Sequence, residues 1–361
     1  MQKLKQRNMR ITGPTPLPPP VLEALSRQMV SHRSQDFRTC LQRVVHRLKP
    51  LFGTKESPML FTASGTGGME AMIVNTIEPG QKVLAIRIGM FGDRFAEIAR
   101  MYGADVIDWK ISQGQPATPE ELKLELRKAG KIDAVLITHN ETTTGVLNPL
   151  RDLTAVIREE TDALILVDGI SSVRATPVLM EEWGVDAVVT ASQKALMSPP
   201  GLAIIAANQR VQARAARCRA PKYYFDFNRM KDAIAEGTTT YTPAVSSIYG
   251  LDAALQMIET EGFENCFERH RKLSEQLRTR LRQIGITCFA KPGFESPSVT
   301  AILLPEGHSA TTVRSRLEKE HGVFVAQGRK ELKERMLRIG HMGWFDEESI
   351  LGVSEALAAC L

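Results

Sequence analysis

Several features that would mark a disulfide-stapled or membrane-spanning protein are missing from this chain of 361 residues. Its five cysteines are widely spaced and form no CxxC pair, so the sequence predicts neither a disulfide framework nor a zinc site. No apolar run approaches the ~20 residues that cross a bilayer, and no apolar segment follows the basic start. These absences predict a soluble, cytoplasmic protein that binds no membrane and holds no metal.

Motifs that bind nucleotides are lacking as well. The chain contains neither GxGxxG nor GxxxxGK[ST], which argues against a dehydrogenase and against a triphosphate site. The formal net charge of +5 is spread along the chain, and the basic start is too short to predict nucleic-acid binding. We therefore expect no nucleic-acid partner. We interpret the start as a solvated arm that carries four basic residues, Lys3, Lys5, Arg7 and Arg10.

The sequence does contain a regular alternation of strand and helix patterns between residues 59 and 219. This rhythm predicts an α/β fold, in which helices cover both faces of a mostly parallel sheet. The proline-rich stretch 13–20 should be extended, so the first helix is expected to begin at Val21. From about residue 263 the pattern changes to that of a small α+β domain. The predicted parts are an arm (1–20), a large cofactor-binding domain (21–260) and a small C-terminal domain (261–361).

Two residues of this alternation point to a particular chemistry. Asp168 closes the apolar run 163–167, and Lys194 follows the run 186–190, so both lie at carboxyl ends of predicted strands. Open α/β sheets bind ligands at that edge, and an acid with a lysine suits pyridoxal phosphate there. Alternatively, the aspartate caps a helix and the lysine is a solvated surface group. The mostly apolar stretch 195–201 favours the first interpretation, because it would take water away from the amine.

A glycine-rich turn, 63–68, joins a short strand to a helix. Such a turn directs backbone N–H groups and the positive end of the helix dipole at one point, to which Thr66 adds a hydroxyl. It either binds phosphate or is only a tight turn. Phe91 lies between two glycines after the next strand, where its ring either stacks on a ligand or anchors the loop.

Three further segments carry polar side chains. Residues 139–145 follow a buried strand and are typical of a ligand-facing loop, although turn and cap roles would also explain them. Residues 222–236 interrupt the alternation without predicting an element, and a hydroxyl-rich loop, 237–243, follows them. Arg338 ends a strand just before a turn with two glycines, where it either holds a carboxylate or forms a surface salt bridge.

Together and in this order, these segments resemble the class V branch of the fold-type I pyridoxal phosphate enzymes, most closely the alanine–glyoxylate and serine–pyruvate aminotransferase group. The resemblance runs nearly from end to end through MRITGPTPLPPPVL, SGTGG, HNETTTGVLNPL, LVDGISS, SQKALMSPPG, TYTPAVSSIYGL and LRIGHMG. Its most specific part is VDGISSVRATP, with Lys194 placed 26 positions after Asp168. The resemblance implies the fold-type I architecture and a homodimer with shared active sites.

By this resemblance Lys194 is the Schiff-base lysine, Asp168 is the partner of the pyridine nitrogen, and Phe91 stacks on the cofactor ring. Gly13 and Arg338 are assigned to the substrate, Arg338 as the carboxylate clamp. Gly68 is a departure, since some relatives carry histidine there. The other implied cofactor residues are Thr66, Gly67 and Gly68 at the phosphate, Thr142 near the ring hydroxyl, Gln193 beside the lysine, and Thr240 and Thr242 on a loop that reaches the neighbouring subunit's cofactor.

The implied activity is a ping-pong transamination from a small amino acid, alanine or serine, to a 2-oxo acid, glyoxylate or pyruvate. Aminoethylphosphonate and ureidoglycine transaminases share most of these motifs and stay open as alternatives. A cysteine desulfurase-like lyase needs a thiol near the small domain, and residues 325–338 contain no cysteine. From a different class, a non-catalytic regulatory protein that binds pyridoxal phosphate would need an appended DNA-binding domain, for which residues 1–20 are expected to leave no room.

Overall fold

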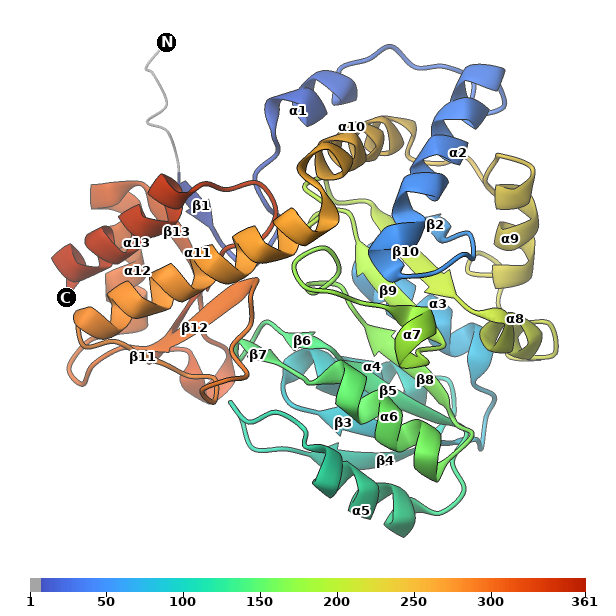
Figure 1. The fold of residues 1–361 in the computed structure, drawn as a ribbon, viewed down its shortest axis with the longest axis horizontal. Helices are drawn as coiled ribbons and strands as arrows, with labels where there is room; N and C mark the ends of the chain where they lie inside the picture. Colours follow the sequence, from blue (N-terminus) through green and yellow to red (C-terminus); the bar gives the residue numbers. More distant parts are fainter. Residues whose placement is uncertain (1–7) are drawn as a thin grey trace.

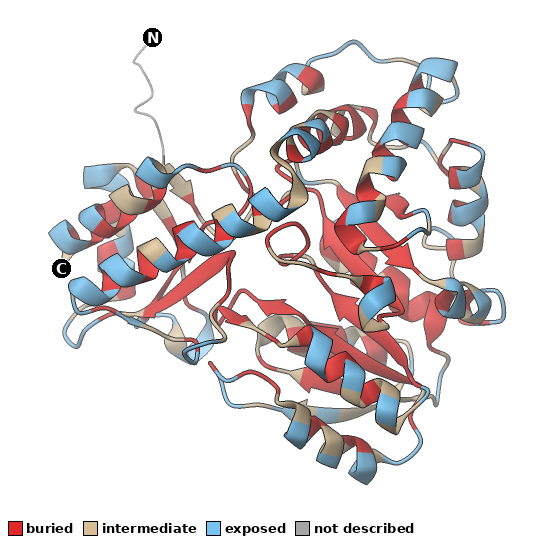
Figure 2. Cartoon of the chain, viewed as in Figure 1, coloured by how far each residue is buried: buried red, intermediate tan, exposed pale blue. Residues whose placement is uncertain are grey.

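The computed structural model describes residues 8–361, which form a larger and a smaller sheet with helices packed on each (Figure 1). The predicted α/β fold is confirmed. Lys3, Lys5 and Arg7 lie outside the described residues. Figure 2 shows that the strands of the large sheet are mostly buried, whereas the outer faces of the surrounding helices are exposed.

The large sheet has seven strands. In spatial order they are β2 (Met59–Thr62), β10 (Leu202–Ala207), β9 (Ala187–Ala191), β8 (Leu164–Asp168), β5 (Ala134–Thr138), β3 (Lys82–Arg87) and β4 (Asp105–Lys110). Only β10 runs antiparallel to its neighbours. The central strands β5, β8 and β9 are buried along their whole length, as expected for strands covered on both faces.

Helices cover both faces of this sheet. Right-handed crossovers place α3 and α4 on one face and α5 and α6 on the other, and Figure 1 shows α6 in front of the sheet and α4 behind it. Among residues 8–361, no helix is long and apolar enough to cross a membrane. The helices of this larger part are α1 (Pro19–Leu25), α2 (Gln35–Leu48), η1 (Lys49–Phe52), α3 (Gly65–Thr76), α4 (Met90–Met101), α5 (Pro119–Ala129), α6 (Leu150–Glu160), α7 (Met180–Trp183), α8 (Gln209–Ala215), α9 (Phe227–Ala235) and α10 (Val245–Glu261).

The small sheet has a core of its own, formed by residues between Leu273 and Cys360. Its strands, in spatial order, are β1 (Asn8–Arg10), β13 (Val323–Gln327), β14 (Met336–Gly340), β12 (Val299–Leu303) and β11 (Thr287–Cys288). A separate hairpin, β6 (Asn140–Glu141) with β7 (Val146–Leu147), follows β5. The remaining helices are α11 (Phe263–Gln283), α12 (Ala310–His321), η2 (Lys330–Leu332) and α13 (Glu347–Cys360).

The interpretation of Arg10 as part of a solvated arm is wrong. Arg10 ends β1, which pairs in parallel with β13 at the edge of the small sheet, and its side chain is 5% exposed. The chain then crosses to the larger part, where α1 packs on α10. Three residues are too few to show a strand period in the sequence, and the edge that this strand completes lies more than 300 residues away.

Two helices differ from the sequence prediction. α1 begins at Pro19 rather than at Val21, because proline fits the first turn of a helix, where its missing N–H has no partner to lose. α9 was not predicted at all. Its signals were present, since Asp226 accepts hydrogen bonds from the backbone N–H groups of Asn228 and Arg229, and buried residues recur at helical spacing.

His341, which follows β14, should make the protein less stable at acid pH. Its buried ring contacts Thr300 Oγ1 at 2.8 Å and the carbonyl oxygen of Pro297 at 3.0 Å, and burial lowers its pKa to about 3. The unfolded chain binds a proton at this ring below about pH 6.5, so the stabilisation is complete above that pH and is lost toward pH 3. Between pH 6.5 and pH 5, His341→Gln should therefore lose about 2 kcal/mol less unfolding free energy than the natural protein.

Urea denaturation at both pH values measures this difference. His46 is exposed on α2, so His46→Gln serves as the control and should lose as much stability as the natural protein. An equal loss in His341→Gln would contradict the assignment of a neutral, buried ring.

Candidate active site

The two strand-end residues singled out in the sequence lie at one edge of the large sheet. Asp168 is the last residue of β8, and Lys194 lies in the loop after β9, the neighbouring strand. The Asp168 side chain accepts a hydrogen bond from the N–H of Ile170 at 3.0 Å. Because parallel strands end at the same edge, the fold brings an acid and an amine from different strands into one site.

Burial shifts the pKa of both groups toward the neutral form. Burial raises the pKa of Asp168 to about 7, and the nearby Glu141 adds to this rise. Burial also lowers the pKa of Lys194 to about 8, although the attraction of Asp168 opposes the shift. The amine is therefore partly neutral near physiological pH, as a nucleophile must be.

The N-terminal segment holds Lys194 from the other side. Lys194 Nζ donates to the carbonyl oxygen of Thr12 at 2.5 Å, and the N–H of Thr15 donates to the carbonyl of Gln193 at 3.0 Å. Gly13 has φ +105 and lies directly against the lysine side chain. The predicted substrate residue Gly13 thus contacts the reactive amine.

Gly13→Ala should displace Lys194. An added Cβ would lie 2.7 Å from Nζ and 2.8 Å from Cδ of Lys194, and the backbone there favours glycine. Since misplacing a reactive group by about 1 Å costs up to ~100-fold in rate, we expect the cofactor that the sequence resemblance implies, pyridoxal phosphate, to bond to the protein at least about tenfold more slowly. Visible absorbance measures that rate. Gly352→Ala is the control, because nothing lies within 4 Å of its added Cβ, and equal rates in the two variants would contradict the expectation.

The glycine-rich turn begins α3 and faces the same edge. Ser64 caps the helix by accepting from the N–H of Gly67 at 3.3 Å, and Thr66 Oγ1 accepts from Arg94 at 3.1 Å. Gly68 differs from its neighbours. It faces the sheet, since a Cβ there would lie 2.5 Å from Val189, and its N–H already donates to Ser64 within the helix. The end of α3 and Arg94 therefore form the positively charged part of the site, and Gly68 allows close packing behind it.

Phe91 lies in the first turn of α4 rather than in a loop between strands. The α4 N-terminus is held by the buried carboxylate of Glu141, which accepts from the N–H of Phe91 at 2.9 Å and from that of Gly92 at 3.4 Å. The Arg94 guanidinium lies 4.9 Å from the centroid of the Phe91 ring. Glu141 was predicted only as part of the ligand-facing loop 139–145, since its bond to α4 spans 50 residues, and Arg94 was not predicted, since it looks like any charged helix residue.

Several buried polar atoms around this edge have no hydrogen-bond partner among residues 8–361. Unpartnered buried polar atoms are rare in folded proteins, and each calls for an explanation such as a ligand. Thr142, predicted near a cofactor hydroxyl, is one, and Gln193, predicted beside the lysine, is another. The unpartnered atoms of this region are Thr138 Oγ1, His139 Nδ1, Asn140 Oδ1, Thr142 Oγ1, Thr144 Oγ1 and Gln193 Oε1.

Arg338 reaches the site from β14 of the small sheet. Its guanidinium donates to the carbonyl oxygens of Gln327 at 2.8 Å and Thr142 at 3.1 Å, and it is 4% exposed. No carboxylate pairs with it among residues 8–361, and burial lowers its pKa to about 10. A buried, oriented and unpaired cation that interacts electrostatically with Lys194 is suited to holding the carboxylate of a ligand.

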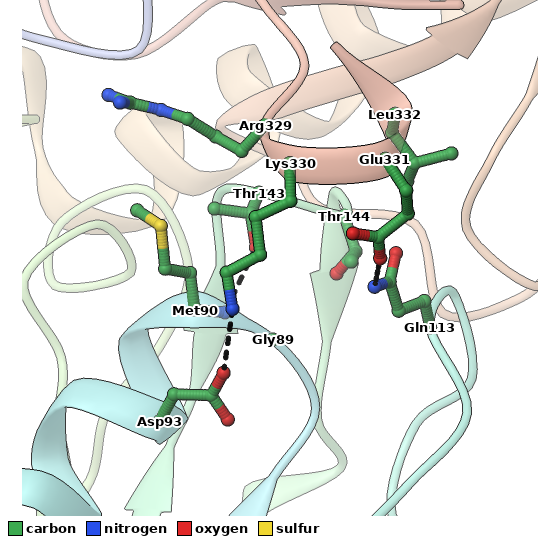
Figure 3. Close-up of a pocket in the computed structure, with 10 residues that line it drawn as sticks. All are labelled: Gly89, Met90, Asp93, Gln113, Thr143, Thr144, Arg329, Lys330, Glu331 and Leu332. Carbon is green, nitrogen blue, oxygen red and sulfur yellow. Dashed lines mark hydrogen bonds and ion pairs between the residues drawn. The ribbon is translucent and has the colours of Figure 1, made fainter.

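A cleft of about 410 Å³ opens next to this site, between the N-terminus of α4 and the segment that contains η2 (Figure 3). Figure 3 shows Lys330 pointing across the cleft to Asp93, 3.9 Å away, and Glu331 pointing to Gln113, 2.5 Å away. Thr143 lines the same cleft. Side chains of η2 therefore meet α4 and the loop at Gln113 across this cleft.

The loop with Thr240 and Thr242 lies apart from these residues. Thr240 Oγ1 contacts Met230 at 3.7 Å, Thr242 is exposed, and Tyr241 stacks between two partly exposed tyrosines. No described contact joins this loop to Lys194 or Asp168. Within one chain, the structure does not bring Thr240 and Thr242 to the site.

One group of potential metal ligands occurs in the described part of the chain, Glu320, His321 and Cys360 on the helices beside the small sheet. Arg316 already pairs with Glu320 at 3.1 Å and donates to the carbonyl of Cys360 at 2.7 Å. The carboxylate of Glu320 in this group is therefore already paired with a cationic side chain.

Comparison with known proteins gives consistent results. Residues 10–344 match the family model described as aminotransferase class V. A Paracoccus denitrificans protein named L-aspartate–glyoxylate aminotransferase is 36% identical (97% of this chain, 90% of the relative), and a Synechococcus protein named soluble hydrogenase, small subunit, is 35% identical (98% and 92%). The crystal structure of a Nostoc alanine–glyoxylate aminotransferase superimposes with a TM-score of 0.94 at 30% identity, over 100% of this chain and 97% of that one.

Proposed function

The chain belongs to the class V aminotransferases, which use pyridoxal phosphate, and from this premise we propose that it moves an amino group from a small amino acid to a 2-oxo acid. Alanine or serine is the proposed donor, and glyoxylate or pyruvate the proposed acceptor. The observation that carries the proposal is the buried guanidinium of Arg338, which forms no salt bridge among residues 8–361, donates to backbone carbonyl oxygens and acts electrostatically on the partly neutral amine of Lys194.

The residues present fit pyridoxal phosphate. Lys194 would bond to its aldehyde carbon, Asp168 would face its ring nitrogen, and Phe91 would cover its ring. The end of α3 with Thr66, Gly67 and Arg94 would hold the phosphate, while Thr142 and Gln193 offer buried oxygens without partners to its polar groups. Gly68 would contribute close packing at this helix end. The bound cofactor supplies a conjugated ring that accepts the electron pair left when the Cα–H bond of the donor breaks.

Lys194 and Asp168 would divide the proton chemistry between them. Buried Asp168 becomes an ionised partner once a positive charge lies beside it, because an opposite charge lowers the pKa that burial has raised to about 7. Lys194, whose pKa burial lowers to about 8, is able to take a proton from the donor Cα and to return it to the cofactor carbon that is bonded to the amino nitrogen. Thr12 holds that amine in position at 2.5 Å through its carbonyl oxygen.

The buried cation of Arg338 would fix the substrate carboxylate. Donation to two backbone carbonyls orients the guanidinium without neutralising it, so its full charge is available to an anion. Donor and 2-oxo acid both carry a carboxylate and would use the same clamp in turn, which agrees with a ping-pong cycle.

Glyoxylate is the acceptor that the names of two relatives support, since the Paracoccus and Nostoc proteins are both named for it. Their named donors differ, one being aspartate and the other alanine. Ureidoglycine stays an alternative donor, because a ureidoglycine–glyoxylate aminotransferase from Bacillus subtilis has a TM-score of 0.92 at 30% identity.

We further propose that the protein acts as a homodimer. The Thr240–Thr242 segment is stacked against Tyr223 and Tyr224, which are 69% and 40% exposed. Exposed aromatic side chains are enriched at protein interfaces. A second copy of the chain would bring Thr240 and Thr242 to its neighbour's cofactor phosphate.

Half-reactions measured one donor at a time test the proposed activity. Alanine or serine should convert the cofactor to its amine form, seen as loss of visible absorbance, and glyoxylate or pyruvate should restore the absorbance. Aspartate, ureidoglycine and 2-aminoethylphosphonate complete the donor panel. A cofactor that none of the five donors changes would overturn the proposal, and a response limited to one of the last three would replace the proposed donor.

A further inference from the structure

Arg174 is the most unusual residue near the site, and the mechanism above does not use it. It adopts φ +71, a backbone conformation that glycine favours, and its side chain is 1% exposed. Left-handed backbone in a non-glycine residue and a buried guanidinium both carry a free-energy cost. Such features persist where surrounding contacts hold them, and they often accompany function.

The contacts of Arg174 join the segments that carry the two central residues. Arg174 lies in the turn six residues after Asp168. Its Nη1 donates to the carbonyl oxygen of Ala195 at 2.7 Å, and Ala195 directly follows Lys194. The turn after β8 is therefore tied by a charged hydrogen bond to the backbone of the lysine loop, in which Met197 also has a positive φ of +55.

A second hydrogen bond of the same guanidinium links it toward the small domain. Its Nη2 donates to Glu261 at 3.0 Å, and Glu261 accepts two further bonds from Arg269, at 2.5 and 3.0 Å. Glu261 ends α10, and Arg269 lies on α11, the helix that leads into the small domain. Arg269 also donates to the carbonyl of Gly343 at 3.3 Å, just beyond β14, which carries Arg338.

Apolar side chains join the same segments. Ala175 and Ala195, the residues after Arg174 and Lys194, form a small buried cluster with Val299 and Met342 of the small domain. Added carbon at Gly343 would lie 3.3 Å from the carbonyl oxygen of Lys194, so the two domains touch beside the lysine.

From these contacts we propose that Arg174 is a positioning residue, which fixes the lysine loop relative to Asp168 and, through Glu261 and Arg269, couples it to the small domain. The proposal rests on the proposed role of Lys194 and adds the means by which its amine is kept buried. Asp168, Arg338 and Arg94 are the charged groups that act on this amine. Loosening the loop would admit water and relieve the burial that lowers the amine pKa.

Arg174→Gly tests this role directly, since glycine keeps φ +71 without strain while the whole side chain, with its guanidinium, is lost. The readout is the rate at which apoprotein captures pyridoxal phosphate, measured against pH. For the natural protein we expect a midpoint near pH 8. In Arg174→Gly the midpoint should rise by about half a pH unit or more, so that capture below the midpoint slows about threefold. In turnover, kcat should fall about ten- to hundredfold with KM for the donor little changed.

Two further variants keep the test decisive. Glu261→Gln, at a side chain that is 27% exposed, removes the ionic link to α11 and should shift the midpoint in the same direction but less. Arg174→Lys keeps the charge without the two-pronged geometry and should recover part of the effect. Arg158→Ala is the control, because Arg158 pairs with buried Asp186 just before β9, at the end of that strand away from Lys194.

A folded Arg174→Gly with the natural midpoint and kcat would overturn the proposal, as would the same shift in Arg158→Ala. If Arg174→Gly does not fold, an unchanged midpoint in Glu261→Gln overturns the coupling. The capture assay needs no amino donor. Should every donor fail in the half-reactions, the proposed activity falls while the result for Arg174 stands.

Discussion

Lys194→Ala should lower the rate of amino transfer by roughly 10⁴-fold or more, because it removes both the covalent attachment point and the proton carrier. The amine of Lys330, which lies in the neighbouring cleft, points to Asp93 instead. The variant should still bind pyridoxal phosphate, since Asp168, Thr66 and Arg94 are untouched. Borohydride reduction followed by mass spectrometry measures the covalent bond, and coupled assays measure the turnover.

Lys128→Ala is the control for this substitution, since its side chain is 69% exposed on α5. It should keep both the covalent bond and the activity. A cofactor that borohydride still attaches to Lys194→Ala would show that another amine does the chemistry, and the proposed role of Lys194 would then be wrong.

Arg338→Ala should raise the donor concentration needed for half-maximal reaction between about thirtyfold and several thousandfold. This range corresponds to the roughly 2–5 kcal/mol lost when one partner of a buried charge pair is removed. The cofactor should stay bound and keep its absorbance, because no proposed cofactor contact comes from β14. Half-reactions over a range of donor concentrations measure the change.

Arg335→Ala provides the matched control, because Arg335 lies three residues earlier in the chain and is exposed. Its donor dependence should equal that of the natural protein. Unchanged donor dependence in Arg338→Ala, or equal losses in both variants, would argue that the substrate carboxylate binds elsewhere.

The sequence could predict those site residues that lie at the carboxyl ends of predicted strands. Asp168 and Lys194 stand at the ends of two apolar runs, and any parallel sheet built from those runs places them at one edge. The glycine-rich turn at Thr66 and the strand with Arg338 follow from equally local patterns, although Arg338 lies within β14 and does not end it as predicted. Their proposed roles needed, in addition, the resemblance between whole sets of motifs.

The rest depends on contacts between distant segments, which local patterns do not encode. Glu141 caps α4 from 50 residues away, and Thr12 meets Lys194 across 182 residues. The sequence around Arg174, VRATP, predicts only an ordinary turn residue, since nothing in it indicates that the guanidinium is buried. Asp226 before α9 is a different case, because an aspartate that caps a helix is a local pattern that the sequence does contain.

The pairing of β1 with β13 has a consequence for the order in which the protein is made. The ribosome makes Val323–Val325 more than 300 residues after their partners, Asn8–Arg10. Such long-range pairing slows folding and leaves strand edges open in the meantime. Because Thr12 and Gly13 follow β1 directly, the contact of this segment with Lys194 would become secure only once β13 has emerged. A nascent chain of this protein would thus stay unable to hold the Lys194 amine until β13 has been made.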